Sequence, residues 1–294
     1  MNFQAEFVAF ARSAMPGGRL RIAPTPSGFL HPGNALNFTL NWLTARLSPE
    51  GRILLRIDDL DADRKREEYV QDIFDTLQWL GLDWDEGPRT VADLENTWSQ
   101  HLRLDQYKTL LDALAANNLL FACRKSRRDL EPWQGAYPPE FRRQGLSLDE
   151  PDAAWRIATP DGFPMSDFIV RRRDGLPAYQ IASLSDDLQF GITHIIRGED
   201  LRASTAAQLF LADCLQVPDF QRIKFLHHPL IKDVSGEKLS KSAGATSLRA
   251  MRESGAGPDM VFDQVAGMLG LPAGKYPDSQ ALLRAVRVLV AGLN

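Results

Sequence analysis

The sequence has little cysteine, no long apolar run and no excess of positive charge. Its 294 residues include two cysteines, Cys123 and Cys214, which lie too far apart for any recognised metal-binding spacing. No apolar run approaches the roughly 20 residues that a membrane span requires. The formal net charge is −4, so no overall positive field attracts the chain to nucleic acid. Any RNA contact must therefore rest on local patches.

The start of the chain lacks the features of a secretion signal. Residues 1–18 contain the acidic Glu6 and have no basic start followed by an apolar stretch. Two thiols in a chain of this size are typical of a reduced protein, although one disulfide between them stays open. With 44% hydrophobic and 24% charged residues, the composition fits two domains, or one domain with a large insertion. We expect a monomeric, cytoplasmic protein in which residues 1–18 form an N-terminal extension, either a short extra helix or a loose arm.

Strand and helix patterns alternate in the first part of the chain. Residues 20–23 and 53–57 are apolar strand candidates. Helices are predicted after Gly33, around residues 69–80 and at residues 101–118, each with apolar side chains at helical spacing. Strand–helix–strand order of this kind predicts a doubly wound parallel sheet with right-handed crossovers.

The periodicity disappears between residues 119 and 175, which are rich in proline and arginine, and then returns. Strands are predicted at 192–196 and 223–231, with a helix at 205–215 between them. We therefore predict an α/β, Rossmann-like domain formed by residues 19–118 and 176–242. Residues 119–175 form an inserted α+β module, and residues 243–294 form a short helical C-terminal segment.

A first motif, R-I-A-P-T-P-S-G-F-L-H-P-G-N at residues 21–34, places a strand, a turn and a helix start in succession. The backbone N–H groups at a helix N-terminus form a natural phosphate site. Gly33 lets the backbone approach a nucleotide without a Cβ atom in the way. His31 is placed to donate to a phosphate oxygen as charge builds during displacement at phosphorus. Taken alone, such a motif is more often a tight turn with a surface histidine.

A second motif, K-L-S-K-S at residues 238–242, follows a predicted strand and a glycine-containing loop. Lys238 and Lys241 are suited to clamp a triphosphate and to offset charge on departing pyrophosphate. A short lysine–serine run is by itself usually a solvated loop. The two motifs together, in this order and on either side of an α/β pattern, are typical of class I aminoacyl-tRNA synthetases.

The chain resembles the glutamyl/glutaminyl branch of these synthetases over nearly its whole length. Residues 21–28 are similar to the branch signature R-F-A-P-S-P-T-G, and residues 56–61 (R-I-D-D-L-D) to its R-I-E-D-T-D run. Residues 81–88 (G-L-D-W-D-E-G-P) and 196–201 (I-R-G-E-D-L) also match stretches typical of the branch. The resemblance implies a ligase that uses ATP with Mg²⁺ to form glutamyl-adenylate, releases pyrophosphate, and transfers glutamate to tRNA.

The resemblance also implies a role for each residue that matches the family motifs. Arg21 and Arg197 each hold a carboxylate of glutamate, as a bidentate guanidinium does better than an ammonium. Asp58 faces the α-ammonium and Tyr179 hydrogen-bonds the side-chain carboxylate, while Ala23 and Thr25 line the floor of the site. The residues implied for ATP are His31, Gly33, Asn34, Asp200, Lys238, Ser240 and Lys241, of which His31, Lys238 and Lys241 are catalytic.

Two of these roles have alternatives. Asp58 is one methylene shorter than the glutamate of the glutamyl pattern, and glutaminyl relatives carry aspartate there, so a close analogue of glutamate stays open. For Arg21 and Arg197, the alternative is a surface salt bridge. Asp59, Asp61 and Asp63 are interpreted as a strand-end turn and helix cap rather than a metal site.

The inserted module departs from the family pattern at its metal positions. In the truncated members of the branch, zinc is usually held through C-x-C and a later Y-x-x-x-C. The corresponding positions here are Phe121, Cys123, Tyr137 and Phe141. One thiolate and one phenol do not make a stable tetrahedral site. We therefore predict no zinc and a module held by apolar packing.

The C-terminal part is too short for the helical half with which full-length glutamyl enzymes read the anticodon. The resemblance therefore narrows to the truncated members, which attach glutamate to the queuosine base of tRNA(Asp). It implies that the insertion binds an anticodon arm through basic side chains. The basic residues available are Arg124, Lys125, Arg127, Arg128, Arg171, Arg172 and Arg173. The alternative is that these residues are only solvated surface. A different acceptor, a small-molecule nucleotidyltransferase, a non-catalytic RNA-binding paralogue and a truncated full-length enzyme stay open as alternatives.

Overall fold

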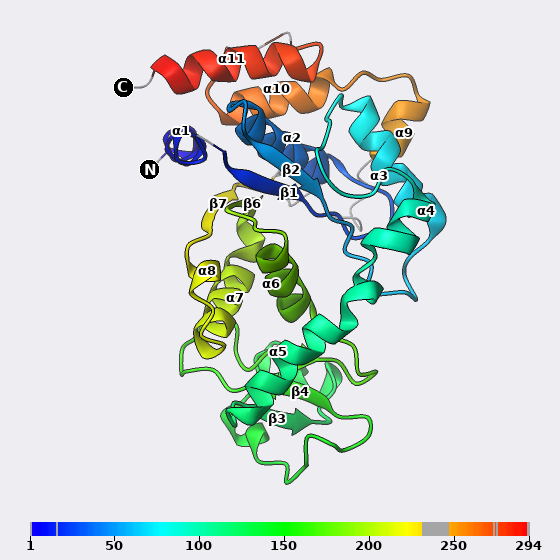
Figure 1. Ribbon diagram of the computed structural model, residues 1–294, viewed down its shortest axis with the longest axis vertical. Coiled ribbons are helices and arrows are strands. Elements are labelled where there is room, and N and C mark those ends of the chain that lie inside the picture. The colour runs from blue at the N-terminus through cyan, green and yellow to red at the C-terminus, as the bar shows by residue number, and fades with distance from the viewer. Residues whose placement is uncertain (1, 16, 231–246, 273, 275, 293–294) are drawn as a thin grey trace. The chain divides into compact units, whose positions relative to one another are not determined.

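The chain forms two compact units. The structure, a computed structural model, describes residues 2–15, 17–230, 247–272, 274 and 276–292. Unit 1 comprises residues 1–102, 191–200 and 223–294, and unit 2 comprises residues 103–190 and 201–222. Figure 1 shows the elements of each. The predicted insertion, residues 119–175, falls inside unit 2, and its boundaries stay a prediction.

Unit 1 contains two parallel strand pairs. β1 (Arg19–Ile22) pairs with β2 (Arg52–Leu55), and β6 (His194–Gly198) pairs with β7 (Lys224–His228). The pairs begin side by side, because the N–H of Thr193 donates to the carbonyl of Arg19 (2.9 Å). The predicted strands are therefore present, displaced by a few residues at their ends. Within each pair the carboxyl ends meet at one edge, which is where open α/β sheets hold their ligands.

The helices of unit 1 cover this parallel sheet. α2 (Pro32–Arg46) is buried almost all round, and it contacts β1, β2 and β6 as well as the C-terminal helices. Those are α10 (Asp259–Met268) and α11 (Ser279–Gly292), which lie together beyond α2 (Figure 1). Unit 1 also contains the helical segments α1 (Phe3–Ser13), α3 (Glu67–Trp79), α4 (Val91–Asp93), η1 (Leu94–Trp98) and α9 (Leu248–Glu253). The short turns η2 (Gln100–Arg103) and η5 (Glu199–Leu201) lie where the chain passes from unit 1 to unit 2.

The N-terminal extension is helical. Its helix α1 packs on α11, and the Arg12 guanidinium donates two hydrogen bonds to the carbonyl of Val290 (2.6 and 3.0 Å). Phe7 and Ala11 of α1 are fully buried in the unit 1 core. Of the two predicted forms, the extra helix is therefore the one present.

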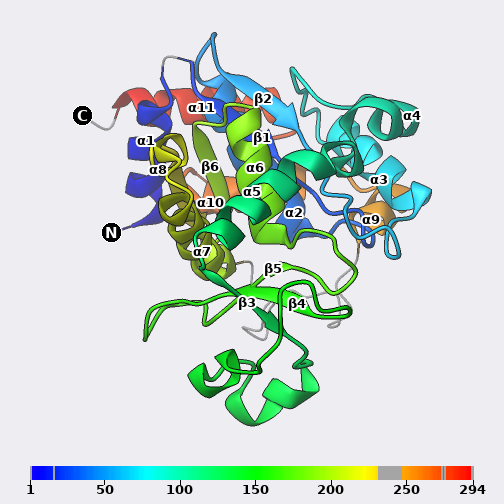
Figure 2. The same ribbon diagram turned by 60° about the horizontal axis from the view of Figure 1, so that its bottom comes forward.

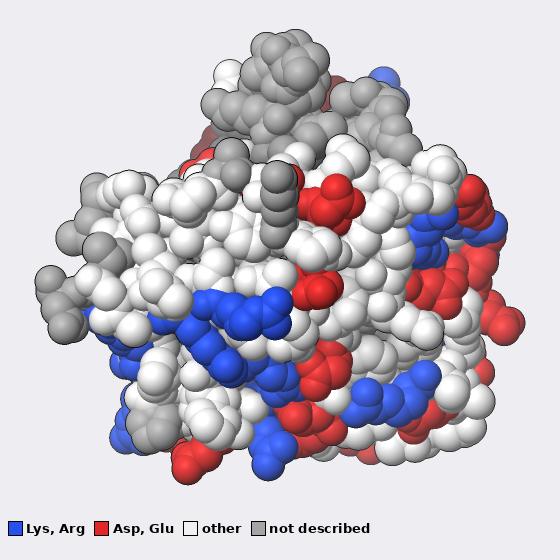
Figure 3. Space-filling view, turned by 90° about the horizontal axis from the view of Figure 1, so that it is seen from above, with Lys and Arg blue, Asp and Glu red and all other residues white. Residues whose placement is uncertain are grey.

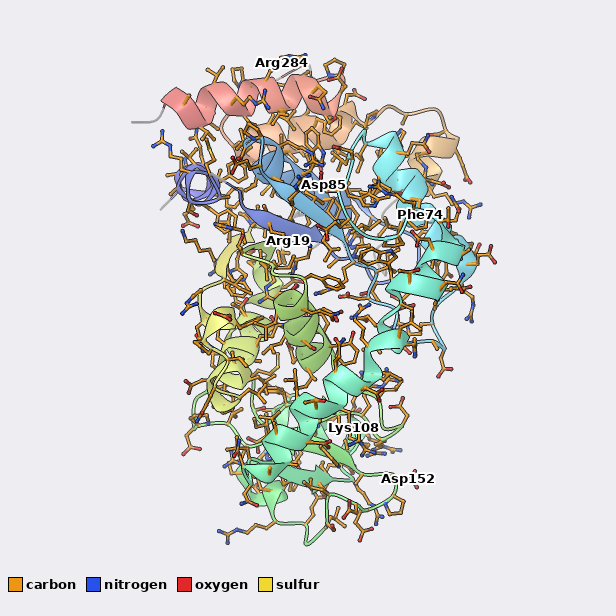
Figure 4. All side chains as sticks on the ribbon, viewed as in Figure 1. Arg19, Phe74, Asp85, Lys108, Asp152 and Arg284 are labelled. Carbon is orange, nitrogen blue, oxygen red and sulfur yellow. The ribbon has the colours of Figure 1, made fainter. Side chains whose placement is uncertain are left out.

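The stretch at residues 81–88 forms the outer neighbour of β2. The N–H of Leu55 donates to the carbonyl of Glu86 (2.8 Å), and Asp85 Oδ2 accepts from Ile53 N (2.7 Å) and Arg46 (2.9 Å). Arg19 and Asp85, both labelled in Figure 4, belong to this region of unit 1. Gly87 has φ +110°, and a Cβ there would lie 2.1 Å from the Leu55 carbonyl oxygen, so the position requires glycine.

Unit 2 combines helices with a small antiparallel sheet. The sheet has the order β3 (Leu120–Cys123), β4 (Ala154–Ile157), β5 (Ile169–Arg171), with the irregular helical turns of residues 128–142 beside it (Figure 2). The short helices η3 (Arg128–Trp133) and η4 (Pro139–Arg142) form those turns. The sheet and turns together give the predicted α+β character of the insertion. The longer helices are α5 (Leu104–Ala116), α6 (Tyr179–Gln189) and α7 (Arg202–Cys214), followed by the short α8 (Pro218–Gln221).

A buried ion pair holds the helices of unit 2 together. The Arg103 guanidinium donates to both Asp186 oxygens (2.9 and 3.0 Å), and the Tyr107 hydroxyl donates to Asp186 Oδ1 (2.8 Å). Asp186 is fully buried, so its charge requires these partners. The contacts tie the start of α5 to the middle of α6.

The surface shows charges of both signs. On the face seen in Figure 3, lysine and arginine side chains form a band that has aspartate and glutamate beside it. This mixture agrees with the net charge of −4. Among the described residues, no helix combines the length and the apolar character that crossing a membrane demands.

Candidate nucleotide and amino-acid site

His31 caps the helix that follows the first motif. Its ring Nδ1 accepts from the N–H of Gly33 (3.1 Å), and the Asn34 side chain accepts from the N–H of His31 (3.0 Å). This reciprocal arrangement satisfies two N–H groups at the start of α2. Because Nδ1 acts as an acceptor, the neutral ring carries its proton on Nε2, which is the donor that the predicted phosphate contact needs.

Gly33 has a further reason to be glycine. A Cβ at this position would lie 2.9 Å from Cε1 and 3.0 Å from Nδ1 of the His31 ring. A side chain would therefore displace the ring from its capping position. The sequence-based role, close approach of a nucleotide, and this packing role call for the same residue.

The turn after β1 runs beside the turn after β2. The N–H of Arg56 donates to the carbonyl of Ile22, and the N–H of Asp58 donates to the carbonyl of Pro24, both at 2.9 Å. These bonds bring the backbone around Ala23 and Thr25 next to Asp58. Arg21, on β1, is 4% exposed. Four of the residues implied for glutamate therefore belong to one corner of unit 1.

Asp58 has a partner that the sequence motif did not identify. Arg56 Nε donates to Asp58 Oδ1 (2.7 Å), and a terminal guanidinium nitrogen donates to Oδ2 (3.2 Å). Gln100 Nε2 donates more weakly to Oδ1 (3.4 Å). Both carboxylate oxygens of Asp58 therefore accept from the Arg56 guanidinium. Spacing two residues apart puts both side chains on the same side of an extended chain, which is the signal that identifies the pair.

Asp59 has a structural role. Its carboxylate accepts from Ser99 Oγ (2.8 Å), Gln100 N (2.8 Å) and Lys65 Nζ (3.2 Å), and it is 1% exposed. These bonds anchor the segment before α5 to the end of β2. Among the described residues, no three histidine, cysteine, aspartate or glutamate side chains gather as a metal site.

Arg197 lies near the end of β6, and Asp200 follows that strand in η5 (Glu199–Leu201). Arg197 is 3% exposed, and its guanidinium lies over the Phe225 ring of β7, 4.9 Å from the ring centroid. Glu199 Oε1 accepts from the N–H of Leu230 (3.4 Å). Leu230 precedes the second motif by eight residues in the sequence. Lys238, Ser240 and Lys241 lie outside the described residues, so their roles stay predictions.

Asn37 and His228 are site neighbours that the sequence motifs missed. Asn37 Nδ2 donates to the carbonyl of Ile196 (3.1 Å) and lies 3.2 Å from His228 Nε2, while His228 Nδ1 lies 2.9 Å from the Pro229 carbonyl. The pattern assigns the His228 proton to Nδ1. Burial lowers the pKa of His228, against smaller opposing contributions from Pro229, Asp200 and Glu199. The neutral ring therefore ties α2 to the ends of β6 and β7.

This lowered pKa predicts a pH-dependent stability. A histidine whose folded pKa lies below its unfolded value of 6.5 favours folding fully above that pH, and the advantage is lost as the pH falls. We expect the free energy of unfolding in urea to decrease between about pH 7.5 and pH 5.5. His228→Gln keeps an acceptor for Asn37 and a donor for Pro229, and should weaken this dependence. If the variant showed the same pH dependence as the wild type, His228 would not be its cause. Burial also lowers the pKa of His194, so we expect a smaller pH dependence to remain in the variant.

Tyr179 belongs to unit 2, whereas Arg21, Asp58 and Arg197 belong to unit 1. Tyr179 is the first residue of α6, and it is 40% exposed. Its predicted hydrogen bond to glutamate stays a prediction.

Several basic residues of the insertion make contacts within unit 2. Arg124 pairs with Glu150 (2.9 Å), Arg172 pairs with Asp174 (2.6 Å), and Arg171 lies over the Trp155 ring. The Lys125 ammonium lies over the Phe141 ring, 4.5 Å from its centroid. Exposed pairs of this kind contribute little to stability, so they do not decide whether these cations also bind RNA, which stays a prediction.

The positions that the resemblance implies as former zinc ligands form one cluster. Cys123, Leu130 and Tyr137 are buried together, and Phe121 and Phe141 pack against them. The Tyr137 hydroxyl donates to Cys123 Sγ (3.2 Å) or the Phe141 carbonyl (2.9 Å), and accepts from Gln144 (2.8 Å). The Arg156 guanidinium lies over the same ring, 4.3 Å from its centroid. Aromatic packing and one phenol thus connect these segments of the insertion.

The metal content of the purified protein tests the prediction that the insertion binds no zinc. We expect purified protein to contain no stoichiometric zinc, because one thiolate with a phenol offers too few ligands. Elemental analysis by mass spectrometry measures this, with dialysis against a chelator as the control for loosely bound ions. One zinc per chain that survives dialysis would contradict the prediction.

Comparison with known proteins agrees with the motifs. The family model described as tRNA synthetases class I (E and Q), catalytic domain, matches residues 19–144 and 154–278. A glutamyl-Q tRNA(Asp) synthetase from Nitratidesulfovibrio vulgaris is 36% identical over 294 residues, covering 88% of this chain and 87% of that protein. A protein of the same name from Parasynechococcus marenigrum (strain WH8102) is 39% identical over 276 residues, covering 92% and 88%.

Solved structures share the fold. A glutamate tRNA ligase from Elizabethkingia meningosepticum, solved in complex with its amino acid, superposes with a TM-score of 0.70 at 21% identity. The match covers 91% of this chain and 64% of that one, so the chain spans about two thirds of the length of that ligase. At this identity the likeness supports the fold, and the predicted class I catalytic fold is confirmed.

Proposed function

The chain belongs to the class I tRNA synthetase family of the glutamate and glutamine enzymes, and from this premise we propose that it activates glutamate and transfers it to the queuosine base of tRNA(Asp). As a member of this family it is a ligase that uses ATP. Relatives at 36–39% identity carry the name glutamyl-Q tRNA(Asp) synthetase. That name supports the choice of acceptor.

The observation that carries the activation step is the arrangement at the end of β1. The His31 ring caps α2 through its Nδ1, and we propose that its Nε2–H donates to a phosphate oxygen of ATP. In the proposed reaction a carboxylate oxygen of glutamate attacks the α-phosphorus of ATP. The bond to pyrophosphate breaks, and glutamyl-adenylate forms. His31, Lys238 and Lys241 stabilise the charge on the phosphate oxygens and on pyrophosphate.

Buried cations support the choice of an acidic amino acid. Arg21 and Arg197 are 4% and 3% exposed, and each is suited to a carboxylate. Asp58, with its charge shared by Arg56, offers acceptors to the α-ammonium. Ala23 and Thr25 form the floor, and Tyr179 contributes its hydroxyl. Gly33, Asn34, Asp200 and Ser240 contact ATP, which we propose is bound with Mg²⁺.

Transfer completes the proposed reaction. A hydroxyl of the acceptor attacks the activated carbonyl, an ester forms, and AMP leaves. We propose that unit 2, including the basic residues of the insertion, binds an anticodon arm, and that the protein acts as a cytoplasmic monomer. A glutamate ligase acting at the tRNA 3′ end uses the same activation chemistry, so only the acceptor separates the two.

The acceptor is tested with radiolabelled glutamate and two tRNA preparations. We expect ATP-dependent labelling of tRNA from cells that make queuosine, and background labelling of tRNA from cells that lack it. Enzymatic removal of the 3′-terminal adenosine should leave the labelling unchanged. Equal labelling of both preparations, or loss of labelling with the 3′ end, would assign the transfer to another acceptor.

A further inference from the structure

Unit 2 holds a cavity whose lining shares two residues with the features described above, Tyr179 and Arg156. Its volume is about 620 Å³, within the range of about 300–1,000 Å³ typical of small-molecule sites. The residues that shape it are Gly135, Arg156, Phe163, Met165, Phe168 and Tyr179. They come from the insertion and from the start of α6.

Three aromatic side chains, Phe163, Phe168 and Tyr179, line this cavity. Phe163 packs on Phe210 of α7, with ring centroids 5.2 Å apart, which holds the ring in place. Phe168 is buried, whereas Tyr179 is 40% exposed. Met165 adds a polarisable thioether. Aromatic rings with a thioether suit the flat π-face of a nucleobase, and stacking of this kind accepts any base.

Two polar groups in the wall lack partners among the described residues. They are Arg156 Nε and Gln180 Oε1, in side chains that are 8% and 7% exposed. The other ends are engaged: the Arg156 guanidinium donates to the Asp167 carbonyl, and Gln180 Nε2 donates to Ser204 Oγ (3.1 Å). A buried donor or acceptor without a partner destabilises the fold, because the group has lost its hydrogen bonds to water. A ligand that offers both an acceptor and a donor removes this cost, and a nucleobase edge offers both.

Free glutamate does not fit the same wall. Among the described residues lining the cavity, Arg156 is the charged one, and no carboxylate is present to meet an ammonium. A bare phosphate would have a single guanidinium, already bonded to Asp167. A neutral, flat ligand agrees with these features better than either ion.

We propose that this cavity receives an unstacked nucleobase of the RNA substrate. The inference rests on the proposed function, because an enzyme that modifies a base of an anticodon loop takes bases out of the stack. Phe163, Met165 and Tyr179 hold the base by its faces. Arg156 and Gln180 bond its edge after small side-chain movements.

Photocrosslinking tests the proposal on the full-length protein. The probe is a hairpin RNA with the anticodon stem and loop of tRNA(Asp), carrying 4-thiouridine at one loop position at a time. We expect one position to crosslink to a peptide containing residues 163–169 or 178–180, and saturating ATP to leave that crosslink unchanged. Binding of the hairpin without such a crosslink overturns the proposal. Loss of the crosslink with ATP also overturns it, since the adenine of ATP would then be the occupant.

Matched variants add a quantitative test. Met165→Ala and Phe163→Leu should each weaken hairpin binding about tenfold, within the energy of one stacked base. Met260→Ala, at a 56% exposed methionine of unit 1, is the control and should not. All three should keep glutamate-dependent ATP–pyrophosphate exchange without RNA. If Met165→Ala and Phe163→Leu bound the hairpin as tightly as the control, the proposed binding of a nucleobase in this cavity would be contradicted. Absent exchange in the wild type contradicts the proposed function instead.

Discussion

Replacing Lys241 with alanine should reduce glutamate-dependent ATP–pyrophosphate exchange by about 10²–10³-fold, the usual effect of removing one charge-stabilising donor. The proposed role of this lysine is to offset the charge that develops on pyrophosphate as its bond to the α-phosphorus breaks. That charge is larger in the transition state than in bound ATP. The kcat of the variant should therefore fall by a much larger factor than its KM for ATP rises.

Lys232 offers a matched control, because it lies in the same part of the chain but outside the K-L-S-K-S motif. Lys232→Ala should retain most of the exchange activity. Urea unfolding of both variants should match that of the wild type. An unchanged exchange rate in Lys241→Ala, or equal losses in the two variants, would contradict the pyrophosphate clamp.

Replacing His31 with asparagine should lower exchange by about 10²-fold while leaving the protein folded. The His31 side chain both caps α2 through Nδ1 and presents Nε2–H. Asparagine is among the best N-cap residues, so it keeps the first function. Its short side chain does not reach where the histidine Nε2 reaches, so it loses the second. Exchange kinetics and urea unfolding, measured on the same preparation, separate the two.

His31→Ala is the companion variant, because it removes both functions. It should lose exchange to the same extent and also lose about 1 kcal/mol of stability, the typical contribution of an N-cap. Normal exchange in His31→Asn would show that the histidine only caps the helix. Equal destabilisation of both variants would contradict the capping argument.

Much of unit 1 was predictable from local sequence. The apolar runs at residues 20–23 and 53–57 identified β1 and β2, because buried parallel strands are continuously apolar. The Pro–Gly turn and the leucine spacing identified α2, whose first turn contains Pro32. The same motif contained His31 and Asn34, which the structure joins as a capping box.

Contacts between distant segments were not predictable in this way. Asn37 and His228 are 191 residues apart, and nothing in either local sequence indicates their contact. The N-terminal helix is held in part by Arg12, which donates to the carbonyl of Val290, and the local sequence does not indicate this contact. β3, β4 and β5 contain three or four residues each, too few for a recognisable period within a proline-rich segment.

The zinc positions show an intermediate case. Loss of ligands at Phe121 and Phe141 was visible in the sequence, and it indicated apolar packing. The sequence did not indicate that the Tyr137 hydroxyl would lie between Cys123, the Phe141 carbonyl and Gln144. Such a network depends on the path of the loops around it, which no local pattern specifies.

The most direct test of the account is ATP–pyrophosphate exchange with each of the twenty standard amino acids, first without RNA and then with tRNA added. Buried Arg21 and Arg197, with Asp58 beside the turn after β1, predict exchange with glutamate and none with aspartate, glutamine or the others. Faster exchange with another amino acid would contradict the glutamate assignment. No exchange with any amino acid, with or without tRNA, would contradict the claim that this protein is an amino-acid-activating ligase.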